Sequence, residues 1–133
     1  MQDMRYLNLF SKIARVDTRY CIKYNDAVIF CVPKNLVMRA MGRDGENLRR
    51  ISETLGKKIR IIPTPRGIFD AKGFIQTIVK PVTFKDLEVK GDEIILTAGN
   101  MQNKANLMGR GKKRLLEMEK IVKDFFGKDF RIN

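Results

Sequence analysis

The sequence repeats one pattern twice, and this repeat constrains the fold more than any other feature of the chain. Each copy contains Met-Gly-Arg, a leucine six residues after that glycine, and a closing Gly-Lys-x-apolar-Arg-Ile. The copies lie 67 residues apart at the first glycine, from Gly42 to Gly109, and 71 apart at the closing glycine, from Gly56 to Gly127. The second copy therefore holds one additional helical turn of about four residues. A repeat of this length predicts two units with one architecture.

The residues before each copy also follow a common pattern of one helix and two strands. The predicted ranges are 4–14, 18–24 and 27–32 in the first half, and 70–79, 82–89 and 93–97 in the second. Each half then reads helix, strand, strand, helix, glycine turn, helix, strand, which is an α+β fold. Two prolines and a glycine interrupt every periodic pattern at 63–67, which predicts domains at 1–64 and 65–133. This linker is short, so we expect the two units to pack together.

The two cysteines lie on the first predicted hairpin, which turns at Asn25 and Asp26. With a two-residue turn, Cys21 is opposite Phe30, and Cys31 is opposite Tyr20. The two thiols then point to opposite faces of the sheet, which excludes a disulfide between them. Two cysteines also fall short of four zinc ligands, so we expect both to be buried apolar residues.

Apolar stripes define the helices on either side of each glycine turn. Asn35 is the expected N-cap of the helix that ends at Gly42. After the turn, the stripe is made of Leu48, Ile51 and Leu55 in the first copy and of Leu115, Met118, Val122 and Phe125 in the second.

The charge balance predicts a polyanionic partner. The chain has 27 Lys and Arg against 15 Asp and Glu, a net charge of +12, and it has no histidine. The surplus is uneven, because residues 1–66 hold 14 basic and 6 acidic side chains whereas residues 67–133 hold 13 and 9. The first half thus carries +8 and the second +4. This surplus attracts nucleic acid.

The absence of histidine also removes several function classes. Ser-His-Asp and Cys-His catalysis and His-ligated metal sites are excluded. A metal-dependent nuclease would need clustered carboxylates, whereas the acidic residues here are scattered. We therefore expect no enzyme activity, no metal and no cofactor.

Nothing in the sequence indicates a membrane segment. The longest apolar run, 27–32, is far shorter than the roughly 20 residues that span a bilayer. The first residues lack the apolar core and cleavage site of a signal peptide. The expected location is the cytoplasm.

The glycine turns are the candidate binding elements. Gly42-Arg43-Asp44-Gly45 joins two short helices, and the missing Cβ atoms let a sugar-phosphate chain approach the backbone. The following helix offers unpaired N–H groups to phosphates. This is the arrangement of the GXXG loop of KH domains, which clamps about four nucleotides of a single strand.

The chain resembles the archaeal NusA-like transcription factors over essentially all of its length. The strings that carry the resemblance are Ala40 to Arg50, Leu55 to Ile61, Asp17 to Cys21 and Ile29 to Val32. The resemblance implies two tandem type II KH domains, each of order α-β-β-α-α-β and packed into one RNA-binding surface. It further implies a role in transcription elongation or termination, with single-stranded RNA and RNA polymerase or other transcription machinery as partners. We expect a monomer.

The resemblance also assigns RNA-binding residues in both copies. They are Met41, Gly42, Arg43, Asp44, Gly45, Asn47, Arg49 and Arg50 in the first, and Gly109, Arg110, Gly111, Lys112, Lys113 and Arg114 in the second. Met41 and Leu48 match apolar positions on which bases rest, and the strand from Lys58 to Ile62 matches the opposite wall of the groove.

Two of these positions depart from the family pattern. Asp44 places a carboxylate where a phosphate is expected, which weakens binding by repulsion. Lys112 replaces the second glycine of the second loop, and its side chain hinders close approach to the backbone there. Four cations, Arg110, Lys112, Lys113 and Arg114, surround that loop and attract phosphates.

Two alternatives remain. One is a ribosome-associated or general RNA-binding protein, since type II KH domains also occur in ribosomal proteins and GTPases. The other is a protein-interaction scaffold whose KH folds bind RNA weakly, which Asp44 and Lys112 favour. RNA affinity separates the second alternative from the others.

Overall fold

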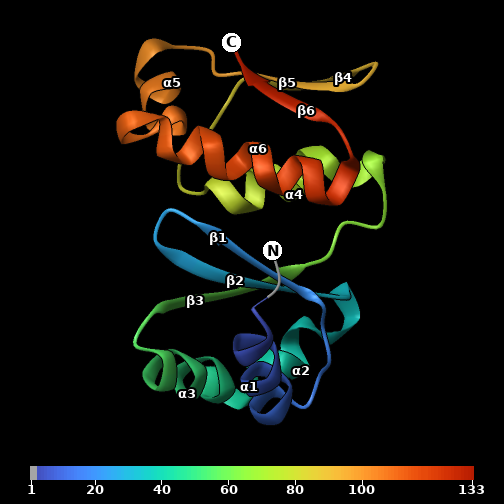
Figure 1. Cartoon of the computed structure of the whole chain (residues 1–133), viewed down its shortest axis with the longest axis vertical. Helices are drawn as coiled ribbons and strands as arrows, with labels where there is room; N and C mark the ends of the chain where they lie inside the picture. Colours follow the sequence, from blue (N-terminus) through green and yellow to red (C-terminus); the bar gives the residue numbers. More distant parts are fainter. Residues whose placement is uncertain (1–2) are drawn as a thin grey trace. The chain divides into compact units, whose positions relative to one another are not determined.

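The computed structural model describes residues 3–133 and divides the chain into two compact units, one ending at Thr64 and the other beginning at Pro65 (Figure 1). Both units are α+β. The elements of the first unit are α1 (Met4–Ala14), β1 (Tyr20–Tyr24), β2 (Ala27–Val32), η1 (Lys34–Leu36), α2 (Val37–Met41), η2 (Arg43–Gly45), α3 (Glu46–Leu55) and β3 (Lys58–Pro63). Those of the second are η3 (Ile68–Asp70), α4 (Ala71–Val79), β4 (Asp86–Lys90), β5 (Glu93–Thr97), α5 (Met101–Met108), η4 (Arg110–Lys112), α6 (Lys113–Phe126) and β6 (Asp129–Ile132).

The two units share one sheet topology. The strand orders are β1-β2-β3 and β4-β5-β6, and in each sheet the first pair is antiparallel and the second pair parallel. A parallel pair needs a long crossover connection, which α2 and α3 supply in the first unit and α5 and α6 in the second. The glycine turn lies in the middle of each crossover.

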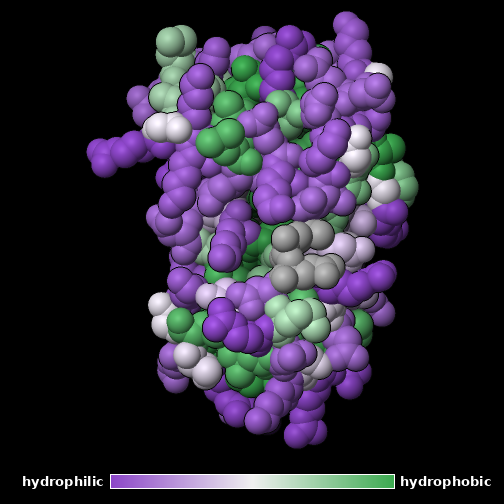
Figure 2. Space-filling view, in the orientation of Figure 1, coloured by the Kyte–Doolittle hydropathy of each residue, from purple (hydrophilic) through white to green (hydrophobic). Residues whose placement is uncertain are grey.

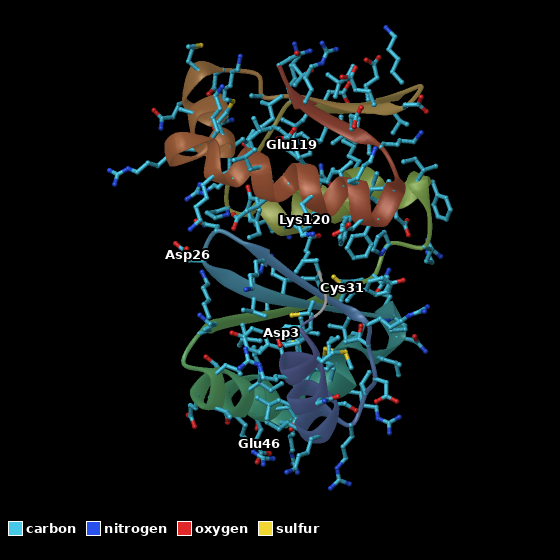
Figure 3. The ribbon with its side chains drawn as sticks, viewed as in Figure 1. Asp3, Asp26, Cys31, Glu46, Glu119 and Lys120 are labelled. Carbon is cyan, nitrogen blue, oxygen red and sulfur yellow. The ribbon has the colours of Figure 1, made fainter. Side chains whose placement is uncertain are left out.

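The first hairpin has the predicted register. Cys21 pairs with Phe30 and Tyr20 with Cys31. Asn25 and Asp26 both have positive φ, 51° and 63°, as a two-residue hairpin turn requires. Asp26 lies at the tip of this hairpin (Figure 3).

The register also confirms that both cysteines are free thiols. Cys21 belongs to the cluster of buried residues between sheet and helices, together with Phe30, whereas Cys31 does not. Burial raises the pKa of the Cys21 thiol to about 11, because the low-polarity surroundings disfavour the thiolate.

In the first unit, α1, α2 and α3 cover one face of the sheet (Figure 1). The Phe10 and Phe30 rings stack at a centroid distance of 4.4 Å, and Ile51 of α3 is fully buried beside them. Leu48 and Leu55 are partly buried against the same cluster, which confirms the predicted stripe.

In the second unit, α6 lies along the sheet and contacts β6 (Figure 1). Its stripe residues Met118 and Val122 are buried, and so are Ile94 and Leu96 of β5. The Phe74 ring of α4 lies 4.9 Å from that of Phe125, centroid to centroid, so the first turns of α4 meet the last turns of α6.

Two local predictions were wrong. The strand predicted at 82–89 begins only at Asp86, because Asp86 pairs with Thr97 and the partner strand ends there. Asn35 does not cap the helix that follows it. Instead the backbone N–H of Leu36 bonds to the Pro33 carbonyl at 2.8 Å, which forms a 3₁₀ turn, and α2 begins at Val37.

Hydrophilic side chains cover most of the face seen in Figure 2, and apolar side chains appear there in scattered patches. In residues 3–133, no helix combines the length and the apolar character needed to cross a membrane. The same residues contain no group of three or more carboxylate, thiol or imidazole side chains placed to hold a metal ion.

Candidate nucleic-acid interface

The first loop, Gly42–Gly45, turns the chain sharply between α2 and α3. Gly42 has φ 80° and ψ 171°, a conformation that essentially only glycine adopts. A Cβ atom on Gly42 would also lie 2.8 Å from the Asn47 side chain and 3.0 Å from the Asn47 backbone nitrogen. Gly42 is therefore required both by its backbone conformation and by the close approach of Asn47.

The rest of the first loop is left-handed. Asp44 has φ 55° and ψ 28°, and Gly45 follows with φ 71° and ψ 20°. The Gly45 N–H donates to the Gly42 carbonyl at 3.1 Å, which closes the turn. Unlike at Gly42, a Cβ atom on Gly45 would meet nothing closer than a guanidinium nitrogen of Arg49 at 3.8 Å.

The second loop, Gly109–Lys112, has the same backbone conformation. Gly109 has φ 74° and ψ 172°, Gly111 φ 61° and ψ 24°, and Lys112 φ 63° and ψ 22°. The Lys112 N–H donates to the Gly109 carbonyl at 3.2 Å, as Gly45 does to Gly42. The lysine has thus not changed the course of the backbone at this corner.

The two loops differ in which of their two left-handed positions carries a residue other than glycine. The first loop has Asp44 and then Gly45 at its two left-handed positions, whereas the second has Gly111 and then Lys112. Each loop therefore contains one side chain at positive φ, an acid in the first loop and a base in the second.

Equivalent side chains support the first glycine of each loop. Asn47 packs on Gly42, and Arg114, which is also five residues after its glycine, packs on Gly109 with its Cγ 2.8 Å from the position of an added Cβ. Arg114 further donates from Nη1 to the Asn106 carbonyl at 2.9 Å. Asn47 and Arg114 are also predicted RNA contacts, which stays a prediction, and in the structure each packs on the first glycine of its loop.

Arg49 is held by the first loop itself. Its Nη1 donates to the Asp44 carbonyl oxygen at 2.6 Å, so the side chain bridges α3 and the left-handed turn. Arg43, Arg49 and Arg50 are all exposed, so what sets Arg49 apart is this hydrogen bond to the loop backbone and not its burial.

Both loops lead directly into the start of a helix that lacks a side-chain cap. Neither Gly45 before α3 nor Lys112 before α6 makes a capping side-chain hydrogen bond. The first helical N–H of each helix, at Glu46 and Lys113, already donates to the carbonyl of Arg43 or Arg110, so it is the positive end of the helix dipole that favours an anion here. Glu46 already places a negative charge in the first turn of α3 and points away from the sheet (Figure 3), whereas Lys113 begins α6.

The apolar positions next to the first loop are half-buried. Met41 and Leu48 pack against the core of the first unit and keep part of their surface exposed. β3 is an edge strand of the sheet, and α2 contacts both β3 and α3. The predicted wall strand thus lies beside the helix that leads into the first loop.

Around the second loop the exposed charge is basic. Arg110, Lys112 and Lys113 are exposed, and Arg114 is half-buried. The structure therefore brings all six predicted residues of this copy to one turn and the helix start behind it.

No family model matches the chain. It is 30% identical over 125 residues to the probable transcription termination protein NusA of Methanocaldococcus jannaschii, an alignment that covers 92% of this chain and 67% of that protein. It is 27% identical over 97 residues to the protein of the same name from Methanococcus vannielii, covering 71% of this chain and 54% of that protein. The chain thus spans only about half the length of this second relative.

The fold has a counterpart among solved structures. The crystal structure of APE1850 matches with a TM-score of 0.64 at 22% identity, covering 98% of this chain and 97% of that chain. The similarity in fold therefore extends over both units of the chain.

Proposed function

Because the chain belongs to the archaeal NusA-like family, we propose that it is a transcription factor that binds single-stranded RNA through two KH domains and acts in elongation or termination. The observation that carries this proposal is the shared geometry of the two loops. Each turns on a glycine whose conformation side chains rarely adopt, opens into a helix start without a side-chain cap and has exposed cations beside it.

The element order supports the KH assignment. Each unit has the order α-β-β-α-α-β, with the glycine turn between its second and third helices. The parallel pairing of the last strand with the one before the crossover fits type II KH topology, which the resemblance implies.

In the first domain, we propose that the backbone supplies the phosphate contact. A phosphate would lie against the positive end of the α3 dipole, and Arg43 and Arg50 would neutralise its neighbours. The half-buried faces of Met41 and Leu48 then offer apolar support to the bases. Arg49 would act through its hydrogen bond to Asp44 by holding the loop in shape.

In the second domain, we propose that side chains supply more of the contact. The Lys112 side chain occupies the corner where a glycine would leave the backbone open. Arg110, Lys112 and Lys113 provide charge at the same place. Binding here should therefore depend more steeply on salt, because each phosphate neutralised by a cation releases counterions.

The test of RNA binding uses a matched pair of substitutions at Gly45. Gly45→Asp and Gly45→Lys impose the same left-handed conformation on a non-glycine residue, and both Cβ atoms have room. They differ in charge, so Gly45→Asp should weaken binding at least tenfold while Gly45→Lys, which mimics the second loop, should bind within about threefold of wild type.

Fluorescence anisotropy with a labelled 12-nucleotide RNA between low and moderate salt measures both variants. The logarithm of the binding constant should fall linearly with the logarithm of salt concentration, by about 0.7 per phosphate contacted. No binding at low salt would contradict RNA binding by both domains and leave a protein-interaction scaffold. Equal binding by Gly45→Asp and wild type would contradict RNA binding by the first domain alone.

The transcription role needs a separate experiment. Pausing and release by the purified archaeal RNA polymerase on a defined template should change when this protein is added, and Gly45→Asp should reduce the change. A protein that binds RNA tightly but leaves polymerase kinetics unaltered would point to the ribosome-associated alternative. The proposed function includes no catalytic step.

A further inference from the structure

Phe69 is a large apolar side chain that the core does not use. It exposes 73% of its surface in η3, the 3₁₀ turn that leads into α4. The other phenylalanines of the second unit, Phe74, Phe84, Phe125, Phe126 and Phe130, are buried or half-buried. Phe69 therefore adds little to the stability of the unit and is available to a ligand.

The Phe69 ring is held in place although it is exposed. The guanidinium carbon of Arg66 lies 5.4 Å from the ring centroid, within the range of a cation–π contact. Arg66 is itself fixed by Asp70, whose carboxylate accepts from the Arg66 backbone N–H at 2.8 Å and from its Nε at 3.1 Å. On another side the ring packs on Gly67, where an added Cβ would lie 2.9 Å away.

We propose that Phe69, with Arg66 beside it, is a stacking platform for one nucleobase of single-stranded RNA. The proposal rests on the RNA binding proposed above and adds a contact separate from both glycine loops. Unpaired bases stack on aromatic rings and on guanidinium planes, and here the guanidinium lies over the ring, so a base would stack on the exposed part of the ring or on the outer face of the guanidinium. A rigid ring loses little conformational freedom when a base binds.

The surroundings favour a base over a protein partner. Ile68, 40% exposed, is the one large apolar neighbour in η3, and the flanking side chains are charged. A protein interface would need a wider apolar centre. The chain also carries a net charge of +12, which attracts an RNA strand and repels other basic surfaces.

The platform lies at the far end of α6 from the second loop. Phe74, near the start of α4, contacts Phe125 and Phe126 at the end of α6, whereas the second loop precedes the start of α6. A helix of 14 residues is about 21 Å long. The roughly four nucleotides that the second loop clamps are held at that loop, so a strand needs further nucleotides to cross this span, and Phe69 should matter more for longer strands.

The chain has no tryptophan, which allows a direct test with Phe69→Trp. A base stacked on the new indole should quench its emission when a 12-nucleotide RNA binds, and a four-nucleotide RNA should quench it much less. Val89→Trp, at an exposed apolar position on the edge strand β4, is the matched control and should not be quenched. Anisotropy of the same labelled RNA reports total binding in parallel.

A second variant measures the energetic contribution. Phe69→Ala should weaken binding of the 12-nucleotide RNA roughly 5- to 150-fold, the usual range for one stacked base, and should leave the melting temperature unchanged. Phe69→Leu should resemble Phe69→Ala, because it keeps the apolar character but loses the ring.

The outcomes separate this proposal from the proposed function. Full RNA binding by anisotropy with an unquenched Phe69→Trp and an unaffected Phe69→Ala overturns the platform alone and leaves the ring to a protein partner. Absence of RNA binding in the wild type overturns the proposed function itself.

Discussion

Lys112 and Gly45 hold the same left-handed backbone conformation, φ 63° and ψ 22° against φ 71° and ψ 20°, directly before the helix that follows each loop. A non-glycine residue in this conformation costs about 1–2 kcal/mol. The first loop has the same cost one position earlier, at Asp44. The turn is thus maintained in both units although the glycine and non-glycine residues have exchanged places.

Gly42→Ala should destabilise the first unit by about 3 kcal/mol or more. The substitution places a Cβ 3.0 Å from the Asn47 backbone nitrogen and imposes a conformation that side chains rarely adopt. Gly56→Ala is the control, because Gly56 also has positive φ but has open space around it, and it should cost about 1 kcal/mol. Urea unfolding followed by circular dichroism measures both; equal losses would contradict the role assigned to Asn47.

Arg49→Ala and Arg50→Ala should affect RNA binding in different ways. Arg49 donates to the Asp44 carbonyl, so its loss should weaken binding with an unchanged salt slope and should speed amide exchange in the first loop. Arg50 is exposed like Arg49, and we propose it as a direct phosphate contact, so its loss should lower the slope by about 0.7 and leave loop exchange unaltered. The two readouts are anisotropy across a salt series and hydrogen exchange; a lower slope for Arg49→Ala would make Arg49 a direct phosphate contact.

Asp44→Asn should strengthen RNA binding. The carboxylate repels a phosphate by about 0.8 kcal/mol at 5 Å in water, which corresponds to roughly fourfold in affinity. Asparagine also tolerates positive φ, so the loop should keep its conformation and its stability. The gain should be measured at low salt and should shrink at higher salt through screening; a gain that is independent of salt would indicate a structural cause.

Stability should fall as pH rises from about 9 to about 11. The pKa of Cys21 is raised to about 11 in the folded state, so the folded protein retains a proton that the unfolded chain releases above its own, lower pKa. The unfolded state is therefore favoured as pH rises through this window, by at most about 3 kcal/mol for this thiol. Because other groups also titrate there, the measurement is the difference between wild type and Cys21→Ala in urea unfolding at several pH values. Parallel curves for the two proteins would contradict the assignment.

Periodicity and turn chemistry predicted most of the elements. The helix at 4–14, the register of the first hairpin and the free cysteines follow from local patterns, and the structure confirms them. The strand predicted at 82–89 was too long at its start, because the partner strand sets where pairing begins. Residues 82–85 alternate like a strand, but the strand that would pair with them has already ended at Thr97.

The sequence predicted both loops as binding elements, which stays a prediction, and the structure adds how their side chains are placed. All predicted residues lie at or beside the two loops, but Asn47, Arg49 and Arg114 bind the protein itself at short range. No spacing rule indicates which arginine of a loop donates to a carbonyl five or eight residues away. Phe69 was missed, although an aromatic residue after Arg-Gly and outside every apolar stripe was a signal for it.

The packing of the two units against each other, the monomeric state and the cytoplasmic location stay predictions. What the sequence by itself determined was two copies of one α+β unit, because hydrophobic periodicity and glycine placement are local properties that each copy repeats. What only the tertiary structure decided was which side chains of each loop remain exposed. That outcome depends on how closely helix and turn approach in space, and the same approach makes Gly42 and Gly109 indispensable while leaving room for Lys112.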